Sequence, residues 1–360
     1  MEHIAAELFQ DKLLKWYYEH KRELPWRQTK DPYKIWLSEI ILQQTRVQQG
    51  LPYWEKFVET FETIIDLANA DEQTVLRLWQ GLGYYSRARN MHAAAQYVRD
   101  ELDGKFPTSF IEIKKMKGVG EYTAAAVASF AFGEKVAVVD GNVYRVLARL
   151  FGMEEDIASA KDQKVFREKA KSLLPDQNIG DYNQAIMEFG AMHCKPANPI
   201  CLFCPFSDFC VARKLGKQGS LPFKSKKVKV RERFFHYLVF EYEGKLLLKE
   251  RKAGDVWQGL FDFPLIEKGE FEEHGKLLDT ISSFAGVNTE NIAVEDESEL
   301  FTHILSHQKL QAKFFSFRLN SEKLAEILTK EYYGSFYDMD EIKDLPKPVL
   351  ILKFLNKGVY

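Results

Sequence analysis

Several features are missing from this sequence of 360 residues, and each absence excludes a class of protein. No run of 18 apolar residues occurs, so no membrane-spanning helix is expected. Residues 1–20 place acidic side chains among the apolar ones, which predicts an amphipathic helix rather than a secretory leader. The chain is also too long to be a single small fold held together by disulfides. We therefore expect a protein that is soluble and not secreted.

The residues that are present can build more than one core. Apolar residues make up 46% of the chain and aromatic residues 14%, which excludes wholesale disorder. A length of 360 residues exceeds that of a typical domain, so two domains are expected. The net charge of −2 conceals a division, because residues 1–233 hold 35 basic and 30 acidic side chains whereas residues 234–360 hold 15 and 22.

The hydrophobic pattern changes at about residue 233. Up to Phe209, apolar residues recur at spacings of three and four, and glycine and proline signals, Leu51-Pro52 among them, divide the segment into roughly ten short helices. Beyond Arg233, apolar and alternating runs predict a hairpin and a further strand. We expect an all-α domain at 1–213, a linker at 214–233 and an α+β domain at 234–360. Strands are expected at 234–242, 245–249 and 310–319, and helices at 275–285 and 321–329.

The linker contains the densest basic stretch of the chain. Between Arg213 and Arg233, nine lysines and arginines stand against one acidic residue, Glu232. Such a run is a solvated linker by default, and contact with a polyanion is the alternative use. Both interpretations stay open.

All four cysteines lie within a short segment, at Cys194, Cys201, Cys204 and Cys210. Such clustering in an intracellular chain indicates thiolate ligation of one metal centre, because disulfides would be reduced there. Zinc and a [4Fe-4S] cluster both accept four sulfurs. A single Cys-x2-Cys pair with one cysteine on each side favours the iron-sulfur cluster, because zinc ribbons usually carry two such pairs. We expect the cluster to fix the shape of its loop rather than to carry out redox work.

Residues 108–132 predict a short helix, a tight turn and an alanine-rich helix. Thr108 or Ser109 can cap the first helix, and Lys117-Gly118-Val119-Gly120 forms the turn. Glycines at 118 and 120 permit a positive φ and leave backbone N–H groups open to a phosphate. Many helix turns contain such a glycine pair, so the turn alone is weak evidence for a binding site.

Two carboxylates occupy positions suited to acid chemistry. Asp140 ends an apolar run and begins the next helix, so it is either an N-cap alone or also a group that stabilises positive charge developing on a sugar. Glu39 projects from the apolar stripe of a helix expected from Tyr33 to Gln48, where burial should raise its pKa into the range of a general acid. An exposed helix glutamate is the alternative for Glu39.

Amides and tyrosines in the helical half have side chains that suit contact with nucleobases. Gln43 and Gln44 supply amides that can meet base edges. Tyr84 and Tyr85, on a glycine turn, are either core residues or stacking wedges in an opened duplex.

Taken together, these segments resemble the helix-hairpin-helix DNA glycosylase superfamily, and within it the adenine DNA glycosylase (MutY) family. The resemblance covers nearly the whole chain in six ordered motifs followed by the cysteine array. The motifs are LPWR at 24–27, WLSEIILQQTRV at 36–47, GLGYYSRARN at 81–90, KGVGEYTAAAVASFAFG at 117–133, VDGNVYRVLARL at 139–150 and NQAIMEFGAMHC at 183–194. The resemblance implies base-excision repair by an all-α helix-hairpin-helix glycosylase domain with an iron-sulfur loop at 194–210, followed by an α+β Nudix-like domain.

One position separates this family from endonuclease III, which shares the cysteine array. Bifunctional enzymes of that kind carry a lysine directly after the hairpin, where it forms a Schiff base with the sugar. Here the residue is Tyr122, which has no amine. The resemblance therefore implies excision of a base without strand cleavage.

The resemblance also implies roles for individual residues. Glu39 would protonate adenine at N7, and Asp140 would stabilise the oxocarbenium-like sugar. Tyr122 and Asn142 would support that sugar and the attacking water. The adenine pocket would be lined by Trp26, Arg27, Leu42, Gln184, Arg22 and Glu188. Contacts to DNA would come from Gln43, Gln44, Thr45, Tyr84, Gly118, Val119 and Gly120, and the cluster ligands would be Cys194, Cys201, Cys204 and Cys210.

The C-terminal half resembles the Nudix-fold domain with which the family inspects the base opposite adenine. Residues 269–286 lack the glutamate-rich helix that a Nudix hydrolase needs to bind its metal, so phosphohydrolase activity is not expected. The family's recognition loop, usually Phe-Ser-His, occurs here as Leu305-Ser306-His307. The change from Phe to Leu loses an aromatic contact with the DNA.

Three functions from different classes compete. The first is an adenine glycosylase that acts on adenine opposite 8-oxoguanine or guanine in duplex DNA. The second is a bifunctional pyrimidine glycosylase and lyase, which Tyr122 disfavours. The third is a nucleotide-pool hydrolase with a DNA-binding N-terminal half, which the missing metal helix disfavours. We expect a monomer with a [4Fe-4S] cofactor in the cytoplasm of a prokaryote.

Overall fold

The computed structural model describes residues 4–225, 230–285 and 291–357. The chain divides into two compact units, of which the first comprises residues 1–69 and 90–226 and the second comprises residues 70–89 and 227–360. Residues 226–229 of the predicted basic linker lie outside the described residues. Among the described helices, none is both long and apolar enough to span a membrane.

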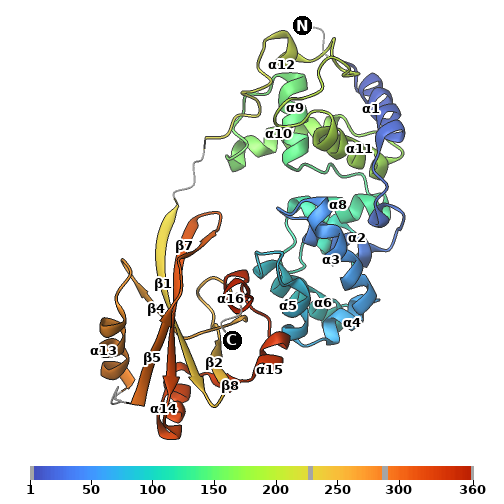
Figure 1. The fold of residues 1–360 in the computed structure, drawn as a ribbon. Coiled ribbons are helices and arrows are strands. Elements are labelled where there is room, and N and C mark those ends of the chain that lie inside the picture. Colours follow the sequence, from blue (N-terminus) through green and yellow to red (C-terminus); the bar gives the residue numbers. More distant parts are fainter. Residues whose placement is uncertain (1–3, 226–229, 286–290, 358–360) are drawn as a thin grey trace. The chain divides into compact units, whose positions relative to one another are not determined.

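Residues 4–225 form helices, as the spacing of their apolar residues predicts, and no strand occurs among them (Figure 1). Five of these helices begin at a side-chain cap, supplied by Asp31, Asp71, Ser109, Asp140 and Ser159. The elements are α1 (Ala6–His20), η1 (Pro25–Arg27), α2 (Pro32–Ile41), α3 (Val47–Thr60), α4 (Ile64–Asn69), α5 (Glu72–Trp79), α6 (Ser86–Glu101), α7 (Phe110–Ile113), α8 (Glu121–Phe132), α9 (Gly141–Phe151), α10 (Ala160–Ser172), α11 (Ile179–Met192) and α12 (Val211–Lys214).

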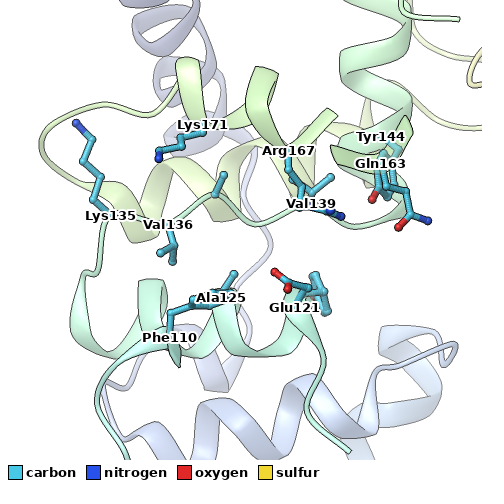
Figure 2. A pocket seen from close by; sticks show the side chains of 12 residues that line it. Phe110, Glu121, Ala125, Lys135, Val136, Val139, Tyr144, Gln163, Arg167 and Lys171 are labelled. Carbon is cyan, nitrogen blue, oxygen red and sulfur yellow. The ribbon is translucent and has the colours of Figure 1, made fainter. Parts of the chain in front are cut away.

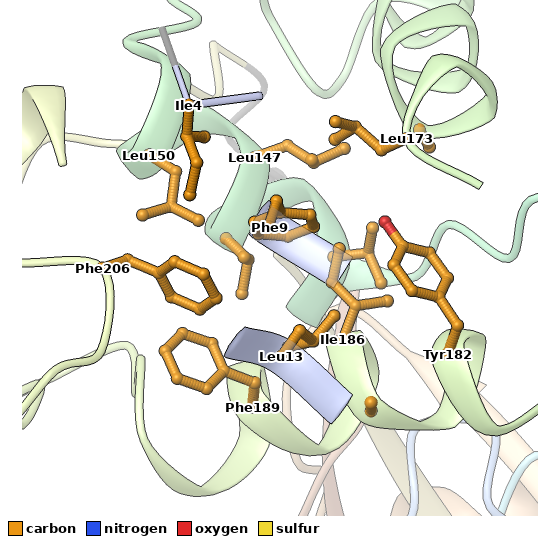
Figure 3. Packing of buried hydrophobic residues seen from close by; sticks show 14 of the residues in the cluster. Ile4, Phe9, Leu13, Leu147, Leu150, Leu173, Tyr182, Ile186, Phe189 and Phe206 are labelled. Carbon is orange, nitrogen blue, oxygen red and sulfur yellow. The ribbon is translucent and has the colours of Figure 1, made fainter. Parts of the chain in front are cut away.

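The hydrophobic core of the first unit lies where α1, α9 and α11 meet (Figure 3). Phe9 of α1, Phe189 of α11 and Phe206 are fully buried, and the ring of Phe206 lies 5.0 Å from that of Phe9 and 5.3 Å from that of Phe189. Leu147 and Leu150 belong to the buried face of α9. Each buried side chain of this size stabilises a fold by roughly 1.5–3 kcal/mol. This core therefore fixes α9 and α11, which both contribute to the cavity described below.

Two predictions about local structure in the helical half are wrong. The helix expected from Tyr33 to Gln48 ends at Ile41, and a turn separates it from α3. The break expected at Leu51-Pro52 is absent, because Pro52 lies inside α3. Proline in a helix removes a backbone hydrogen bond, and the burial of Trp54 and Phe57 on the same helix offsets that loss.

The second unit contains a mixed sheet, and the strands and helices expected in the C-terminal half are confirmed (Figure 1). The strand order is β3-β2-β1-β7-β5, with β4 paired to β1, β6 to β7 and β8 to β2. Strands β1 and β7 are parallel, with Arg231 opposite Gln308. The elements are β1 (Arg231–Tyr242), β2 (Lys245–Glu250), β3 (Phe261–Asp262), β4 (Leu265–Lys268), α13 (His274–Ala285), β5 (Ile292–Glu297), β6 (Phe301–Ile304), β7 (Gln308–Leu319), α14 (Glu322–Tyr332), β8 (Ser335–Tyr337), α15 (Met339–Asp344) and α16 (Val349–Leu355).

The predicted hairpin between β1 and β2 turns at Glu243 and Gly244. Both residues have a positive φ, 49° and 75°, which is the conformation of a two-residue turn whose twist matches that of the strands. Leu277 of α13 and Leu328 of α14 pack with Phe315 of β7 in the core of this unit. Helices α13 and α14 thus cover one face of the sheet.

Candidate active site

A cavity of about 620 Å³ opens in the first unit, and η1, α2, α8, α9 and α11 contribute to its walls. It is lined by every residue to which the resemblance gives a catalytic or adenine-pocket role, namely Arg22, Trp26, Arg27, Glu39, Leu42, Tyr122, Asp140, Asn142, Gln184 and Glu188. Members of this set that touch one another lie up to 166 positions apart in the chain. The fold therefore brings together groups that the sequence predicts separately.

Glu39 lies in α2 with 7% of its surface exposed. Its Oε2 accepts a hydrogen bond from the Tyr122 hydroxyl at 2.5 Å. Burial raises the pKa of Glu39 to about 7, an effect that the Tyr122 hydrogen bond opposes and the charge of Asp140 assists. A carboxyl with this pKa carries a proton in a substantial share of molecules at neutral pH, as a general acid requires. The raised pKa expected from the sequence is confirmed.

Asp140 caps α9 and lines the same cavity. Its Oδ1 accepts hydrogen bonds from the backbone N–H groups of Asn142 (2.9 Å) and Val143 (2.8 Å), and its Oδ2 accepts one from the Asn142 side chain (2.6 Å). Burial raises the pKa of Asp140, and these hydrogen bonds oppose the shift because they favour the charged form. The cap fixes the carboxyl in the cavity wall, so the two roles that the sequence left open are compatible.

Glu188 of α11 is a second buried glutamate in the cavity, and its surroundings differ from those of Glu39. Only 1% of its side chain is exposed. Arg22 donates to it from Nε (2.7 Å) and Nη2 (2.6 Å), and Arg27 donates from Nη2 (2.8 Å). Burial raises the pKa of Glu188, but the hydrogen bonds from both arginines outweigh burial and bring the pKa to about 2. Glu188 is therefore a permanent carboxylate that orients two arginines.

Tyr122 also lines a second cavity of the first unit, of about 370 Å³. Phe110 and Ala125 lie on one side of this cavity, and Arg167 and Lys171 of α10 lie on the other (Figure 2). Burial raises the pKa of Tyr122 well above its ordinary value. The Tyr122 phenol therefore stays neutral, and its hydroxyl remains the donor of the hydrogen bond to Glu39.

Arg145 is a lining residue that sequence reasoning missed. It is 8% exposed, and its Nη2 donates to Oδ1 of Asn142 (2.8 Å) and to the carbonyl of Gly190 (2.7 Å). Its Nε donates to the carbonyl of Cys194 at 2.8 Å. Arg145 thus connects the cavity with the start of the cysteine segment. The only available signal was a charged residue among the apolar positions of α9.

The turn between α2 and α3 holds three residues predicted to contact DNA. Gln44 is exposed and has a φ of 55°, a conformation that an α-helix cannot pass through and that explains why the predicted helix is interrupted. Gln43 donates to Oγ1 of Thr123 at 3.2 Å, so its side chain faces α8. Thr45 lines the larger cavity. Gln44 is therefore the most accessible of the three.

The glycine turn before α8 is confirmed, and one of its two glycines adopts the positive φ that the sequence permits. Gly118 has a φ of 77°, and a Cβ there would lie 2.7 Å from Cβ of Asn90, so the position requires glycine. Gly120 has a φ of −92°, because it is the N-cap of α8 and N-caps have extended backbone. The first N–H groups of α8 have no partner within the helix, which suits them to a phosphate.

The turn between β6 and β7 in the second unit holds the predicted recognition residues Leu305, Ser306 and His307. The N–H of Leu305 donates to the carbonyl of Gln308 at 2.8 Å and closes the turn. Tyr84, which belongs to the same unit, hydrogen-bonds through its hydroxyl to the hydroxyl of Ser306. Tyr84 is 46% exposed with a φ of 48°, whereas Tyr85 is a core residue. The core alternative is thus confirmed for Tyr85, and contact of Tyr84 with DNA stays a prediction.

The four cysteines follow α11, and three of them pack against the core of the first unit: Cys194, Cys204 and Cys210. Arg149 donates to Sγ of Cys194 at 3.5 Å and to the carbonyl of Lys195 at 2.7 Å. Burial raises the pKa of Cys204 to about 12, so a thiolate there needs a positively charged partner. Among the residues that the structure describes, no three or more His, Cys, Asp or Glu side chains converge on a point that could hold one metal ion.

Two family models match the chain. One is described as HhH-GPD superfamily base excision DNA repair protein and covers residues 37–175, and the other is the NUDIX domain and covers residues 236–357. Both matches agree with the fold expected from the sequence, in which a helical glycosylase domain precedes a Nudix-like domain.

Solved structures resemble the helical part of the chain. A thermostable thymine-DNA glycosylase is similar over 58% of this chain and 97% of its own, with a TM-score of 0.54 and 29% identity. A trapped endonuclease III–DNA covalent intermediate is similar over 59% of this chain and 99% of its own, with a TM-score of 0.52 and 22% identity. The second likeness concerns the fold alone.

Similar proteins of known activity match most of the chain. The adenine DNA glycosylase of Buchnera aphidicola subsp. Schizaphis graminum is 31% identical over 95% of this chain and 96% of the relative. The adenine DNA glycosylase of Mus musculus is 32% identical over 87% of this chain and 71% of the relative. With the helical and Nudix segments in the same order and a match over nearly the full length, this chain belongs to the adenine DNA glycosylase family of base-excision DNA repair enzymes.

Proposed function

We propose that this protein is a monofunctional glycosylase that hydrolyses the N-glycosidic bond of adenine paired with 8-oxoguanine, and also with guanine, in duplex DNA. The observation that carries the proposal is the buried Glu39, with a pKa of about 7, in one cavity with Asp140 and Tyr122. A base inside a duplex is out of reach of these groups, so the adenine has to leave the stack and enter the cavity.

Glu39 supplies the proton that makes adenine a leaving group. Protonation at N7 draws electrons from the glycosidic bond, which breaks with its electron pair moving to the base. The Asp140 carboxylate stabilises the positive charge left on the sugar. Water then adds to the sugar carbon and gives up a proton, which the Glu39 carboxylate takes back, while Tyr122 and Asn142 support the sugar and the water.

Six lining residues hold the flipped adenine in this proposal: Trp26, Arg27, Leu42, Gln184, Arg22 and Glu188. The Tyr17 hydroxyl donates to Oε1 of Gln184 at 3.0 Å, which leaves the amide N–H groups of Gln184 as donors. Trp26 and Leu42 supply apolar surface. The pocket therefore offers both a flat apolar contact and directed donors, as a purine requires.

Contacts to the duplex come from the α2–α3 turn, from the glycine turn before α8 and from Tyr84. The residues are Gln43, Gln44, Thr45, Tyr84, Gly118, Val119 and Gly120. The positive φ of Gln44 and of Tyr84 supports this assignment, because strained backbone in residues other than glycine concentrates at binding sites. The N–H groups at the start of α8 suit a backbone phosphate.

Tyr122, two positions after the glycine turn, supports base excision without strand cleavage. Tyr122 has no amine and cannot form an imine with the sugar. Its phenol is also a poor nucleophile, because its pKa is raised and its proton is shared with Glu39. Strands should therefore break only after alkali treatment.

We propose that Cys194, Cys201, Cys204 and Cys210 hold a [4Fe-4S] cluster whose role is to fix the shape of their segment. Each thiolate of such a cluster binds a different iron, so the four sulfurs need not converge on one ion. Protein purified without oxygen should be brown and contain about four iron atoms per chain, one for each cluster thiolate. Colourless protein with stoichiometric zinc would refute the cluster.

The turn residues Leu305, Ser306 and His307 inspect the base opposite adenine. 8-Oxoguanine differs from guanine by an oxygen at C8 and a hydrogen at N7, and the hydroxyl of Ser306 can respond because it both donates and accepts. The monomeric state and the cytoplasmic location stay predictions.

Single-turnover excision tests the proposal with four duplexes, which hold adenine opposite 8-oxoguanine, adenine opposite guanine, thymine opposite guanine, and thymine glycol. We expect base release from the first two, faster from the first, and little protein trapped on DNA by borohydride. Release of thymine or thymine glycol with efficient trapping would overturn the proposal in favour of a bifunctional lyase.

A further inference from the structure

Arg233 of β1 is almost completely buried, with 7% of its side chain exposed, and all five of its guanidinium N–H donors are used. Nε donates to Oε1 of Glu267 (2.8 Å), and Nη2 donates to Oε2 of Glu267 (2.5 Å) and to Oδ2 of Asp255 (2.8 Å). Nη1 donates to Oδ1 of Asp255 (2.7 Å) and to Oε1 of Gln308 (3.0 Å). A planar guanidinium with two forked partners is rigidly held.

The three partners of Arg233 belong to segments that are separate in the chain. Glu267 lies on β4, Asp255 lies in the loop after β2, and Gln308 is the first residue of β7. Gln308 also closes the β6–β7 turn, because its carbonyl accepts from the N–H of Leu305 at 2.8 Å. Arg233 is therefore tied through Gln308 to the turn that carries Ser306.

A second buried arginine completes this network. Arg251 donates from Nη2 to Oδ2 of Asp255 (2.8 Å), from Nε to the carbonyl of Val256 (2.9 Å) and from Nη1 to Oδ2 of Asp262 (2.6 Å). Arg233 and Arg251 thus both hold the loop from Gly254 to Trp257. This loop and the β6–β7 turn line the same cavity, of about 590 Å³.

A buried ion network of this kind contributes little to the stability of a fold. Replacing a buried ion network by apolar side chains often leaves a fold as stable as before, because desolvation of the charges offsets their attraction. What the network supplies is fixed geometry, since the guanidinium of Arg233 allows only one arrangement of its partners. Two further contacts anchor the turn: the hydroxyl of Tyr84 bonds to that of Ser306, and the N–H of Arg231 donates to the carbonyl of His307 at 3.0 Å.

We propose that Arg233 is a positioning residue for recognition of the base opposite adenine, acting through Gln308 on the turn that carries Ser306 and His307 and through Asp255 on the facing loop. This inference rests on the function proposed above, in which the turn distinguishes 8-oxoguanine from guanine. Arg233 itself touches no DNA in this account.

The decisive variant is Gln308→Met, which removes the acceptor that links Arg233 to the turn without altering the turn residues. Its matched control is Gln311→Met on the same strand, where the amide bonds to Glu232 at 3.2 Å and does not contact Arg233. Single-turnover rates on adenine opposite 8-oxoguanine and opposite guanine give the preference. We expect Gln308→Met to lower the preference by about three- to tenfold, as loss of one hydrogen bond allows, with excision opposite guanine unchanged. The control should keep the wild-type preference.

Two further measurements separate positioning from mere folding. Amide hydrogen exchange in a peptide spanning residues 303–309 should become faster in Gln308→Met and in Arg233→Lys, but not in Gln311→Met. In the double variant Ser306→Ala with Gln308→Met, the preference should be no lower than in Ser306→Ala alone, because both changes act on the same contact.

The outcomes are distinguishable. If the wild type shows no preference for 8-oxoguanine, the proposed function fails and this inference with it. If the wild type has the preference and Gln308→Met keeps it, the inference alone is overturned, whether or not exchange becomes faster. Equal loss of both excision rates together with a lower melting temperature would assign Arg233 a purely structural role and would also overturn it.

Discussion

In the helical unit, Glu39 is buried against a tyrosine hydroxyl, and its pKa rises to about 7. In the sheet unit, Asp255 lies between Arg233 and Arg251, and its pKa falls to about 2, chiefly because of the hydrogen bonds from Arg233. The hydrogen-bond partner of Glu39 is a neutral hydroxyl that offsets burial only in part, whereas that of Asp255 is a charged guanidinium, so the two carboxyls differ in the form that dominates at neutral pH. Glu39 in the first unit can therefore exchange its proton near neutral pH. Asp255 in the second unit stays ionised and holds its loop through ion pairs with the two arginines.

Within the catalytic cavity, one glutamate likewise has a raised pKa and another a lowered one. As a result, Glu39 and Glu188 contribute to the free energy of unfolding with opposite sign. The folded pKa of Glu39, about 7, lies above the ordinary value of 4.5, so its contribution to stability falls as pH rises from 4.5 to about 7. The folded pKa of Glu188, about 2, lies below 4.5, so its contribution is present above 4.5 and is lost as pH falls toward 2. The cavity therefore opposes folding through one glutamate and supports it through the other.

The largest effect is expected from Glu39→Gln, which removes the carboxyl with the raised pKa. Single-turnover excision should fall by at least about a hundredfold, because the proton source is lost while shape is kept. At pH 8 the variant should unfold at higher urea, with a gain of about 1–3 kcal/mol, because a buried carboxylate has been removed. Glu59→Gln, an exposed change on α3, is the control and should alter neither quantity. Near-normal excision by Glu39→Gln would show that another group supplies the proton.

Glu188→Gln removes the other carboxylate of the comparison, which is paired with Arg22 and Arg27. The free energy of unfolding should fall by about 2–4 kcal/mol at pH 7, because two arginines would face a neutral amide. The deficit should shrink toward pH 2, where Glu188 of the wild type is itself protonated. Urea unfolding at both pH values measures it. Glu168→Gln, which removes an exposed partner of Lys164, should leave stability unchanged, and equal losses in the two variants would contradict this account.

A variant with both Ser306→Ala and His307→Ala sharpens the contrast between the two units. Excision of adenine opposite guanine should continue, because the catalytic cavity is untouched. The preference for 8-oxoguanine should fall by about 5- to 160-fold, on the order of 1–3 kcal/mol, the usual cost of losing specific base contacts. The ratio of single-turnover rates measures it. An unchanged ratio would place discrimination in the helical unit.

The smallest effect is expected from Tyr122→Phe, which removes the hydrogen bond that lowers the pKa of Glu39. Excision falls as pH rises through that pKa, since the protonated form is the active one. Without the hydrogen bond, the fall should move to higher pH by about one unit. Rates from pH 5 to 9 measure it, with Tyr144→Phe in the neighbouring cavity as the control. A shift to lower pH would contradict the assigned direction.

Predictions from the sequence were correct where a few neighbouring residues decide the outcome. Asp140 caps the helix that follows it, and Glu243-Gly244 forms a turn between two strands. They were wrong where packing overrode local preference. Pro52 lies within α3 because that helix buries an apolar face, and the positive φ of Gln44 interrupts a stretch whose composition is helical throughout.

Periodicity, caps and turns depend on neighbours a few positions away, so they were enough to predict which segments form helices and strands and which residue types could do acid chemistry. The protonation state of those residues depends on contacts between segments that are distant in the chain. Glu39 and Glu188 are both glutamates on largely apolar helices, yet their pKa values lie about five units apart. Burial raises both values, but the hydrogen-bond partner of Glu39 is the neutral hydroxyl of Tyr122, 83 positions away, which offsets burial only in part, whereas Glu188 accepts from the charged Arg22, 166 positions away. Contacts over such distances exist only once the chain has packed, so no local pattern distinguishes the two residues.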